Sequence, residues 1–418
     1  MRYSSALILS MLVLSVASNL LGWPMWPAAV LSWLATLRLG RQLPRTSRRQ
    51  ALLLGGAGVL FWVVALVRDT PNPLVSAIVI NQPLLMMFAG VSFLSLATPS
   101  EKATSTQQQQ GSLLGTLFGV HFFGAVINLS ALFLFGDRMQ RRGQLNKQQM
   151  IVLGRAFPAA AAWSPFFVAM GVALTYAPGL DFLSLLPWGL TAAALLLGLV
   201  ALDAYRVGEE FIGYPLNANA LILPCTLALS VVLIHHWWPD LTIPLIISIV
   251  SPISAILLMS NADRIGRLLH QCNDGLPRLA PQFALFLAAG VLSSGLAAML
   301  ASWPGGPVLP FSEFGEWHAW VLLGVIVVLA FVGIHPLVGV TTLAPLLAPL
   351  SPDPTLLGMM FLMGWALGTG SSPLSGSNLA LSVRYNVKAK DIMRWNLPYA
   401  VSGWLLCGAV FAAHDWLA

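Results

Sequence analysis

Residues 368–378 read GTGSSPLSGSN, and this run interrupts the otherwise apolar stretch 355–385. Proline lacks a backbone N–H and clashes with the preceding helical turn, while glycine tolerates positive φ angles, so we expect residues 368–378 to be unwound. Unwound backbone at membrane depth persists only where it is buried in protein or lines a wet cavity. The run therefore favours a broken helix beside a polar site over a simple proline kink.

The whole chain has the composition of a polytopic membrane protein. Of its 418 residues, 57% are hydrophobic and 9% are charged, and one span needs about 20 apolar residues. The polar stretches have only the length of loops, so we expect no soluble catalytic domain and no enzymatic activity. No Gly-rich loop followed by lysine is present, which excludes nucleotide-driven pumping by this chain alone.

Charge and cysteine content indicate which binding partners and cofactors to expect. The net charge of +6 comes from basic residues in short loops, where they orient spans, so we expect the lipid bilayer and no nucleic acid as partner. Cys225, Cys272 and Cys407 show no metal-ligand spacing, so we expect no cofactor and no metal site.

The basic loops also predict a topology. Basic residues cluster at 38–49, at 138–147 and at 388–394. All three clusters fall on the cytoplasmic face if segments 111–136 and 319–350 are re-entrant hairpins, as the positive-inside rule requires. We therefore expect an all-α protein of a bacterial inner membrane with about 11 transmembrane helices plus two hairpins, its N-terminus cytoplasmic and its C-terminus periplasmic or extracellular.

Self-comparison indicates an internal repeat. The segment GVHFFGAVINLSALF around His121 aligns with GIHPLVGVTTLAPLL around His335 at an offset of 214 residues. The segment WSPFFVAMGVAL aligns with SSPLSGSNLALS, which places Ser164-Pro165 over Ser372-Pro373 at an offset of 208 residues. Under the topology above the two hairpins enter from opposite faces, so the repeats are inverted, an organisation common among secondary transporters.

The repeat divides the chain into four expected parts. They are an extra N-terminal helix over 1–22, a first inverted repeat over 23–205, a cytoplasmic linker over 206–219 and a second inverted repeat over 220–418. The first repeat is expected to hold a hairpin at about 111–136 and a broken helix at about 150–177. The second is expected to hold a hairpin at about 319–350 and a broken helix at about 355–385.

Two broken helices and two hairpin tips are expected to meet near the midplane. Half-helix N-termini offer free N–H groups and partial positive charge to an anion, while unwound carbonyls and hydroxyls can hold a small cation. We place Asn128 and Ser130 at the first tip, and Thr341 and Thr342 at the second. Interhelical hydrogen bonding is the alternative role of such short polar residues.

For each of four ionisable residues, the sequence allows two alternative roles. The symmetry-related His121 and His335 can relay protons or fill structural positions. Arg155 and Arg384 lie toward the cytoplasmic ends of the two broken segments, where snorkelling to the interface is the default and attraction of an anion is the alternative. No carboxylate lies inside an expected span except near an end, as with Asp203, so sodium held by carbonyls and hydroxyls is the favoured coupling ion.

The run SSPLSGSNLALS resembles the Ser/Thr-Pro-bearing, Asn-ending unwound loop of the ion transporter superfamily, which includes divalent-anion/sodium symporters and arsenite/antimonite permeases. The resemblance covers about residues 50–414 and implies a homodimer with a scaffold domain and a mobile transport domain that works as an elevator. It assigns substrate binding to Ser375, Ser377, Asn378, Ser164, Asn128, Thr341 and Thr342. The candidates for ion coupling are Gly370, Ser372, Pro373, Ser130, Pro165, His121 and His335.

These observations favour a secondary active transporter that moves a small organic carboxylate or inorganic oxyanion, coupled to sodium or protons. Leu379 follows Ser377-Asn378 where the dicarboxylate branch has threonine, which leaves the substrate open. An arsenite-type efflux permease and a cation/proton antiporter of the same superfamily are alternatives. The apolar first-half segment AAAAWSPFFVAMG also fits a lipid-handling or accessory membrane protein without coupled transport.

Overall fold

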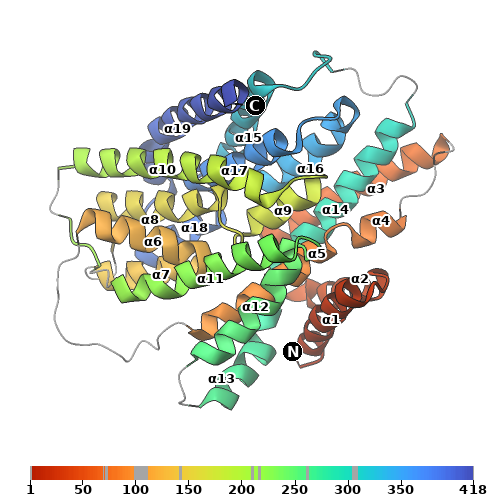
Figure 1. Cartoon of the computed structure of the whole chain (residues 1–418), viewed down its shortest axis with the longest axis horizontal. Coiled ribbons are helices and arrows are strands. Elements are labelled where there is room, and N and C mark those ends of the chain that lie inside the picture. The colour runs from red at the N-terminus through yellow and green to blue at the C-terminus, as the bar shows by residue number, and fades with distance from the viewer. Residues whose placement is uncertain are drawn as a thin grey trace. The chain divides into compact units, whose positions relative to one another are not determined.

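The computed structural model describes residues 2–68, 70, 74–97, 112–140, 144–208, 211–214, 218–259, 263–303 and 309–417 (Figure 1). Every regular element in these ranges is helical, and no β-strand occurs among them. The polar stretch 99–110 and the basic pair Arg141 and Arg142 lie outside the described residues. The expected all-helical architecture is therefore confirmed.

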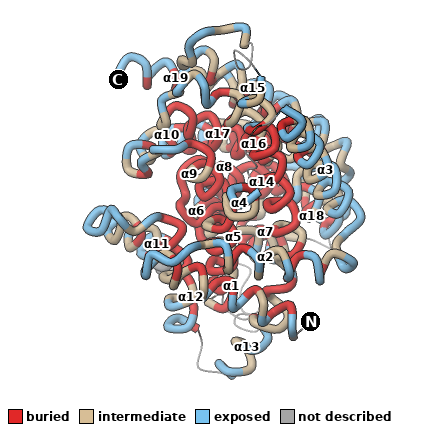
Figure 2. Tube along the Cα trace, turned by 90° about the vertical axis from the view of Figure 1, so that its right-hand side faces the viewer, coloured by how far each residue is buried: buried red, intermediate tan, exposed pale blue. Residues whose placement is uncertain are grey.

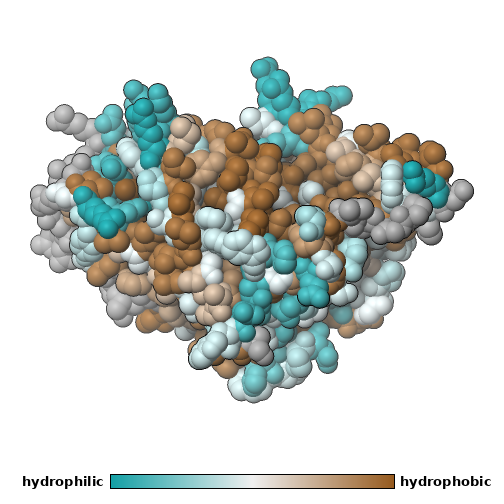
Figure 3. Space-filling model, turned by 90° about the horizontal axis from the view of Figure 1, so that it is seen from above, coloured by the Kyte–Doolittle hydropathy of each residue, from teal (hydrophilic) through white to brown (hydrophobic). Residues whose placement is uncertain are grey.

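Within the described residues, six helices are long and apolar enough to cross a membrane, by length and composition. They are Tyr3–Leu21, Arg45–Val67, Leu74–Ala97, Phe182–Arg206, Arg264–Ala301 and Ala389–Leu417. Hydrophobic residues cover much of the face shown in Figure 3. These features are compatible with a membrane protein.

Contacts divide the chain into two compact units. The first holds Met1–Pro99, Ile234–Glu313 and Thr341–Ser351, and the second holds Ser100–Leu233, Phe314–Val340 and Pro352–Ala418. Each half of the sequence contributes to both units, so the units interleave along the chain and do not follow the boundaries of the expected repeats.

The first unit contains the N-terminal helices and the middle of the chain. Its elements are α1 (Arg2–Leu21), α2 (Trp26–Leu39), η1 (Gly40–Gln42), α3 (Arg45–Val67), α4 (Leu74–Val79), α5 (Gln82–Ser92), η2 (Phe93–Ala97), α12 (Ile243–Leu258), α13 (Arg264–His270), the π-helical turn η4 (Gln271–Gly275), η5 (Leu276–Leu279), α14 (Ala280–Ala301) and η6 (Ala348–Leu350). α11 (Ala218–Trp237) and α16 (Pro336–Leu347) contribute residues to both units.

Small residues allow the closest helix packing in the first unit. A Cβ on Gly58 of α3 would lie 2.4 Å from the Val291 carbonyl oxygen of α14, and one on Gly295 would lie 2.2 Å from the Gly58 carbonyl oxygen. The two backbones therefore touch where they cross, as small residues permit in membrane bundles. Buried Gln82 of α5 links α2 to α1, since its amide accepts from Ser32 and donates to Ser15, both at 2.8 Å.

The second unit holds the first predicted hairpin, both broken helices and the part of the second predicted hairpin up to Val340. Its elements are α6 (Leu113–Ile127), α7 (Leu129–Met139), α8 (Lys147–Ala159), η3 (Ala160–Ala162), α9 (Val168–Tyr176), α10 (Phe182–Arg206), α15 (Glu316–Phe331), α17 (Pro354–Ser371), α18 (Gly376–Tyr385) and α19 (Ala389–Leu417).

α8 and α17 form the centre of the second unit. α8 packs against α6, α7, α10 and α17, and α17 packs against α9, α15 and α19. Nearly all residues of α8, α9 and α17 are buried, and these helices appear red in Figure 2. Polar groups on α8 and α17 are thus shielded from solvent, so they need hydrogen-bond partners within the protein or a bound ligand.

Candidate functional site

The second break lies between α17 and α18. α17 continues to Ser371 because the Ser372 N–H still donates to the Gly368 carbonyl at 3.0 Å, and Pro373 then ends the ladder. α18 begins at Gly376, after Ser375, whose hydroxyl accepts from the Asn378 N–H at 3.3 Å and caps the helix. Only residues 372–375 are unwound, so the expected break over 368–378 was too long.

The first break repeats this local geometry at Ser164-Pro165. Here the Ser164 N–H donates to Ala160 at 2.9 Å, its hydroxyl accepts from the Phe166 N–H at 3.2 Å, and its carbonyl accepts from Phe167 at 3.2 Å. At the second break the corresponding bonds of Ser372 measure 3.0, 3.1 and 3.3 Å. The two Ser-Pro units, 208 residues apart, therefore end their helices in the same way.

The two breaks differ in access. Ser164 is fully buried, and its hydroxyl also donates to the Ala125 carbonyl of α6 at 2.6 Å. At the second break Leu374 and Gly376 are exposed, and Ser375 is half-buried. The backbone of Gly376, the first residue of α18, is therefore accessible, whereas every residue of the first break is buried.

The buried side chain of Asn378 forms hydrogen bonds across the second break. Its side-chain nitrogen lies 2.9 Å from the Ser372 carbonyl oxygen, 3.3 Å from that of Gly370 and 3.4 Å from that of Thr369. These three acceptors require the donor nitrogen there, so the amide oxygen points the other way, toward Gly154 of α8. A Cβ on Gly154 would lie 2.7 Å from this oxygen.

Two buried oxygens at this break have no hydrogen-bond partner among the described residues. They are the Asn378 amide oxygen and the Ser371 hydroxyl. Buried polar atoms are normally paired, and an unpaired one in a native protein points to a bound water, ion or ligand. Carbonyl, amide and hydroxyl oxygens are the ligand types that small hard cations prefer. Sequence reasoning missed Ser371, although it belongs to the Ser371-Ser372 pair.

A network of polar side chains, all buried except half-buried Asp203, connects this break to three other helices. The Gly370 carbonyl also accepts from the Asn396 amide of α19 at 3.1 Å. The Asn396 oxygen accepts from Arg155 Nε of α8 at 2.8 Å, and Arg155 Nη1 lies 2.7 Å from the Asp203 carboxylate of α10. Arg155 also donates to the Trp395 carbonyl.

These contacts indicate the role of Arg155. The side chain is 1% exposed, and each of its three nitrogens donates a hydrogen bond, so it is not a snorkelling anchor. The Asp203 carboxylate is the anion that Arg155 contacts. Sequence reasoning did not identify Asn396, because its partners lie 26 and 241 residues away.

The first hairpin turns at a single residue. Asn128 has φ 55° and ψ −139° and joins α6 to α7. The rings of Phe123 and Phe135 lie 5.8 Å apart, which shows that α7 folds back on α6. Asn128 is half-buried and Ser130 is exposed, at the tip where the sequence placed them.

The second reversal lies elsewhere than expected. The chain turns at residues 332–335, where Gly333 has φ 92°, and α16 then packs back so that a Cβ on Gly339 would lie 3.0 Å from Ile326 of α15. Thr341 and Thr342 lie inside α16, not at the tip. The alignment on histidine failed here because His121 lies within α6 whereas His335 lies in the turn itself.

The two histidines are held differently. His121 Nδ1 lies 3.0 Å from the Ala156 carbonyl, and its Nε2 lies 3.0 Å from Trp163 Nε1. The ring is therefore neutral, with the proton on Nδ1, and both nitrogens are used. His335 Nδ1 accepts from the Leu337 N–H at 3.2 Å, and its ring packs edge-to-face on Trp365 at 5.1 Å.

An ion pair joins the far ends of α7 and α18. Arg384 Nε lies 2.8 Å from one Asp137 oxygen, its Nη2 reaches the other oxygen, and the Tyr385 hydroxyl donates to the same carboxylate at 2.8 Å. Burial raises the pKa of Asp137, but the hydrogen bonds from Arg384 and Tyr385 outweigh it and hold that pKa below its usual range. Arg384 thus has a structural partner.

No protein-family model matches the chain, and no curated protein matches it either. The geometry of the second break and of the helices around it is therefore what indicates a function.

Proposed function

We propose that this protein is a secondary active transporter and that it binds a small anion at the second break. The observation that carries this proposal combines two features of one break: the first residue of α18, Gly376, is accessible, and the buried oxygens of Asn378 and Ser371 have no partner among the described residues. The N-terminus of a half-helix favours an anion, and the oxygens suit a coupling cation. Sodium is the favoured coupling ion, because both nitrogens of His121 are already engaged.

The two compact units support an elevator mechanism. Both breaks and the first hairpin belong to the second unit, which contains residues from both halves of the sequence. We propose that the second unit is the transport domain and the first unit the scaffold, in a homodimer of inverted repeats in the bacterial inner membrane. About 11 crossings, a cytoplasmic N-terminus and an external C-terminus belong to this proposal.

Substitution of Gly376 tests the anion site at its donor groups. Proline at the first helical position fits the fold, because the N–H there has no helical acceptor and Ser375 already has φ −63° and ψ 150°. Gly376→Pro removes one N–H donor, whereas Gly376→Ala keeps it, and a Cβ at Gly376 meets no atom within 4 Å. In proteoliposomes, we expect Gly376→Pro to lower uptake of labelled anions at least about tenfold, because one charge-assisted hydrogen bond to the anion is lost. Gly376→Ala should keep most of the uptake.

Equal uptake by the two variants would contradict the proposed anion site. A panel of carboxylates and oxyanions, with arsenite included, identifies the substrate class. Melting temperatures of both variants show whether a loss of uptake reflects a loss of folding.

A further inference from the structure

α15 and α19 are clamped together at one end by two tryptophans. The Trp320 and Trp404 rings stack with their centroids 4.2 Å apart and their planes at 9°. Each indole N–H donates to the backbone carbonyl of the other residue, at 2.9 Å in both directions. The clamp fixes the spacing of the two helices at this end of the pair.

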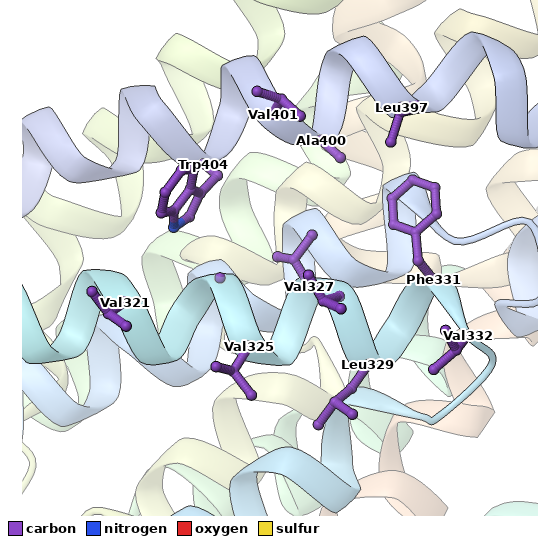
Figure 4. A pocket seen from close by; sticks show the side chains of 12 residues that line it. Val321, Val325, Val327, Leu329, Phe331, Val332, Leu397, Ala400, Val401 and Trp404 are labelled. Carbon is purple, nitrogen blue, oxygen red and sulfur yellow. The ribbon is translucent and has the colours of Figure 1, made fainter. Parts of the chain in front are cut away.

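Away from the clamp the two helices enclose an apolar groove of about 690 Å³. In Figure 4, Val321 and Trp404 lie at one end of the groove, and Phe331, Val332 and Leu397 lie at the other. Several lining side chains are half exposed or more, so the groove opens outward. An open apolar groove on a membrane helix pair faces hydrocarbon, and lipid tails are its natural filling.

The open end of the groove carries positive charge. Lys390 and Arg394 are exposed on α19 and lie on the same helical face as Leu397 and Val401, at spacings of four and three residues. Asp391 is the acidic residue in the first turn of α19, and it lies on a neighbouring face. A ligand that enters the groove from this end therefore meets two cationic side chains.

The dimensions match one leaflet of a bilayer. Ten residues separate Arg394 from Trp404, which is about 15 Å of helix and half of a hydrocarbon core of about 30 Å. The groove runs along about 16 Å of α15, a comparable length. An extended acyl chain can therefore lie along the groove, with its headgroup beside Arg394.

We propose that the groove between α15 and α19 binds an anionic phospholipid of the leaflet in which α19 begins. Lys390 and Arg394 hold the headgroup phosphate, and an acyl chain fills the groove as far as Trp404. The groove borders the second break, since a Cβ on Gly333, next to the lining residue Val332, would lie 2.8 Å from Leu374. Its lining residues differ from the proposed anion and sodium ligands, so lipid binding stands whether or not the protein transports anions.

Lipid titration of the full-length protein, followed by native mass spectrometry in detergent, tests this site. We expect phosphatidylglycerol to bind at least about tenfold more tightly than phosphatidylcholine of the same chains, since each basic residue near an anionic lipid contributes about 1 kcal/mol. The double variant Lys390→Gln/Arg394→Gln should lose this preference. The matched control Arg48→Gln/Arg49→Gln, which changes two exposed arginines of α3, should keep it.

Filling the groove tests the acyl-chain contact. Val401→Trp and Val328→Trp, one on each wall, should each abolish binding of both lipids, whereas Val63→Trp on the exposed face of α3 should not. Equal affinity for the two lipids would overturn the proposal, as would binding that survives both wall substitutions in folded protein. A dimer that dissociates on Val401→Trp would overturn it too, because it would assign the groove to a second copy.

Discussion

Asn378 and Ser371 make the second break more than a kink. The two ends of the Asn378 amide differ: its nitrogen donates to three carbonyls at the break, and its buried oxygen has no hydrogen-bond partner among the described residues. Substitution of Asn378 therefore removes structural bonds as well as a ligand atom. Ser371 offers a cleaner test, because its hydroxyl has no hydrogen bond to lose within the described residues.

Ser371→Ala should weaken sodium binding and leave folding intact. If the hydroxyl is a sodium ligand, its loss should raise the sodium concentration for half-maximal uptake roughly tenfold, about 1.4 kcal/mol. The melting temperature without sodium should stay the same or rise slightly, since an unpaired buried hydroxyl is removed. Measured on the same preparations, an unchanged sodium dependence would remove Ser371 from the ion site.

At the level of single residues, the sequence predicted the proline breaks and the turn at Asn128, because these depend on local backbone chemistry. It did not predict how far each break extends. Ser372 prolongs α17 by one bond to Gly368 and so keeps residues 368–371 helical. It also misplaced Thr341 and Thr342, since a short alignment does not reveal that the chain turns at Gly333.

At the level of helices, buried Arg155 and half-buried Asp203 join α8 to α10. Removal of Asp203 leaves the Arg155 guanidinium buried without its carboxylate, which costs about 3–5 kcal/mol, whereas replacement of both by apolar residues is often neutral. Asp203→Leu should therefore destabilise the protein strongly in thermal unfolding. The double variant Arg155→Met/Asp203→Leu should recover most of that loss. No recovery would show that the bonds from Arg155 to Asn396 and Trp395 dominate.

The ion pair between α7 and α18 predicts a dependence on pH. The pKa of Asp137 is lowered in the folded protein, so its contribution is present above the ordinary carboxyl pKa of about 3.9 and is lost as pH falls through the lowered folded value. The pair is partly exposed and worth roughly 1 kcal/mol or less. Asp137→Asn should lower the melting temperature by about 2 °C or less at pH 7.

Below the folded pKa of Asp137, the native carboxyl is protonated and resembles the amide. The difference between Asp137→Asn and the parent protein should therefore shrink on acidification below about pH 4. A difference that stays constant from pH 7 to pH 3 would mean that packing, and not charge, holds the ends of α7 and α18 together.

Long-range polar contacts explain what the sequence could not predict about the helices. The network from Asp203 through Arg155 and Asn396 to Gly370 joins residues that are 48, 241 and 26 positions apart. Hydropathy marks Arg155 only as a charge near the end of an apolar segment, which is also the signature of a snorkelling side chain. Only the fold shows that Asp203 and Asn396 form hydrogen bonds with Arg155.

On the scale of the whole molecule, composition alone predicted an all-helical, apolar chain. The interleaved units were not predicted, because contacts between distant segments leave no mark in hydropathy. Their composition matters for the proposed mechanism: the breaks of both sequence halves belong to one compact unit, as a transport domain requires.

The proposed function of the whole molecule is anion transport coupled to sodium at the second break. Its most direct test is uptake of labelled anions into proteoliposomes that contain the purified protein, under an imposed sodium gradient or an imposed pH gradient. We predict uptake that requires the sodium gradient, changes only modestly between about pH 5.5 and 8, where an imidazole would titrate, and persists in His335→Gln. Uptake that ignores sodium, follows the proton gradient and disappears in His335→Gln would contradict this account, as would no uptake of any anion under either gradient.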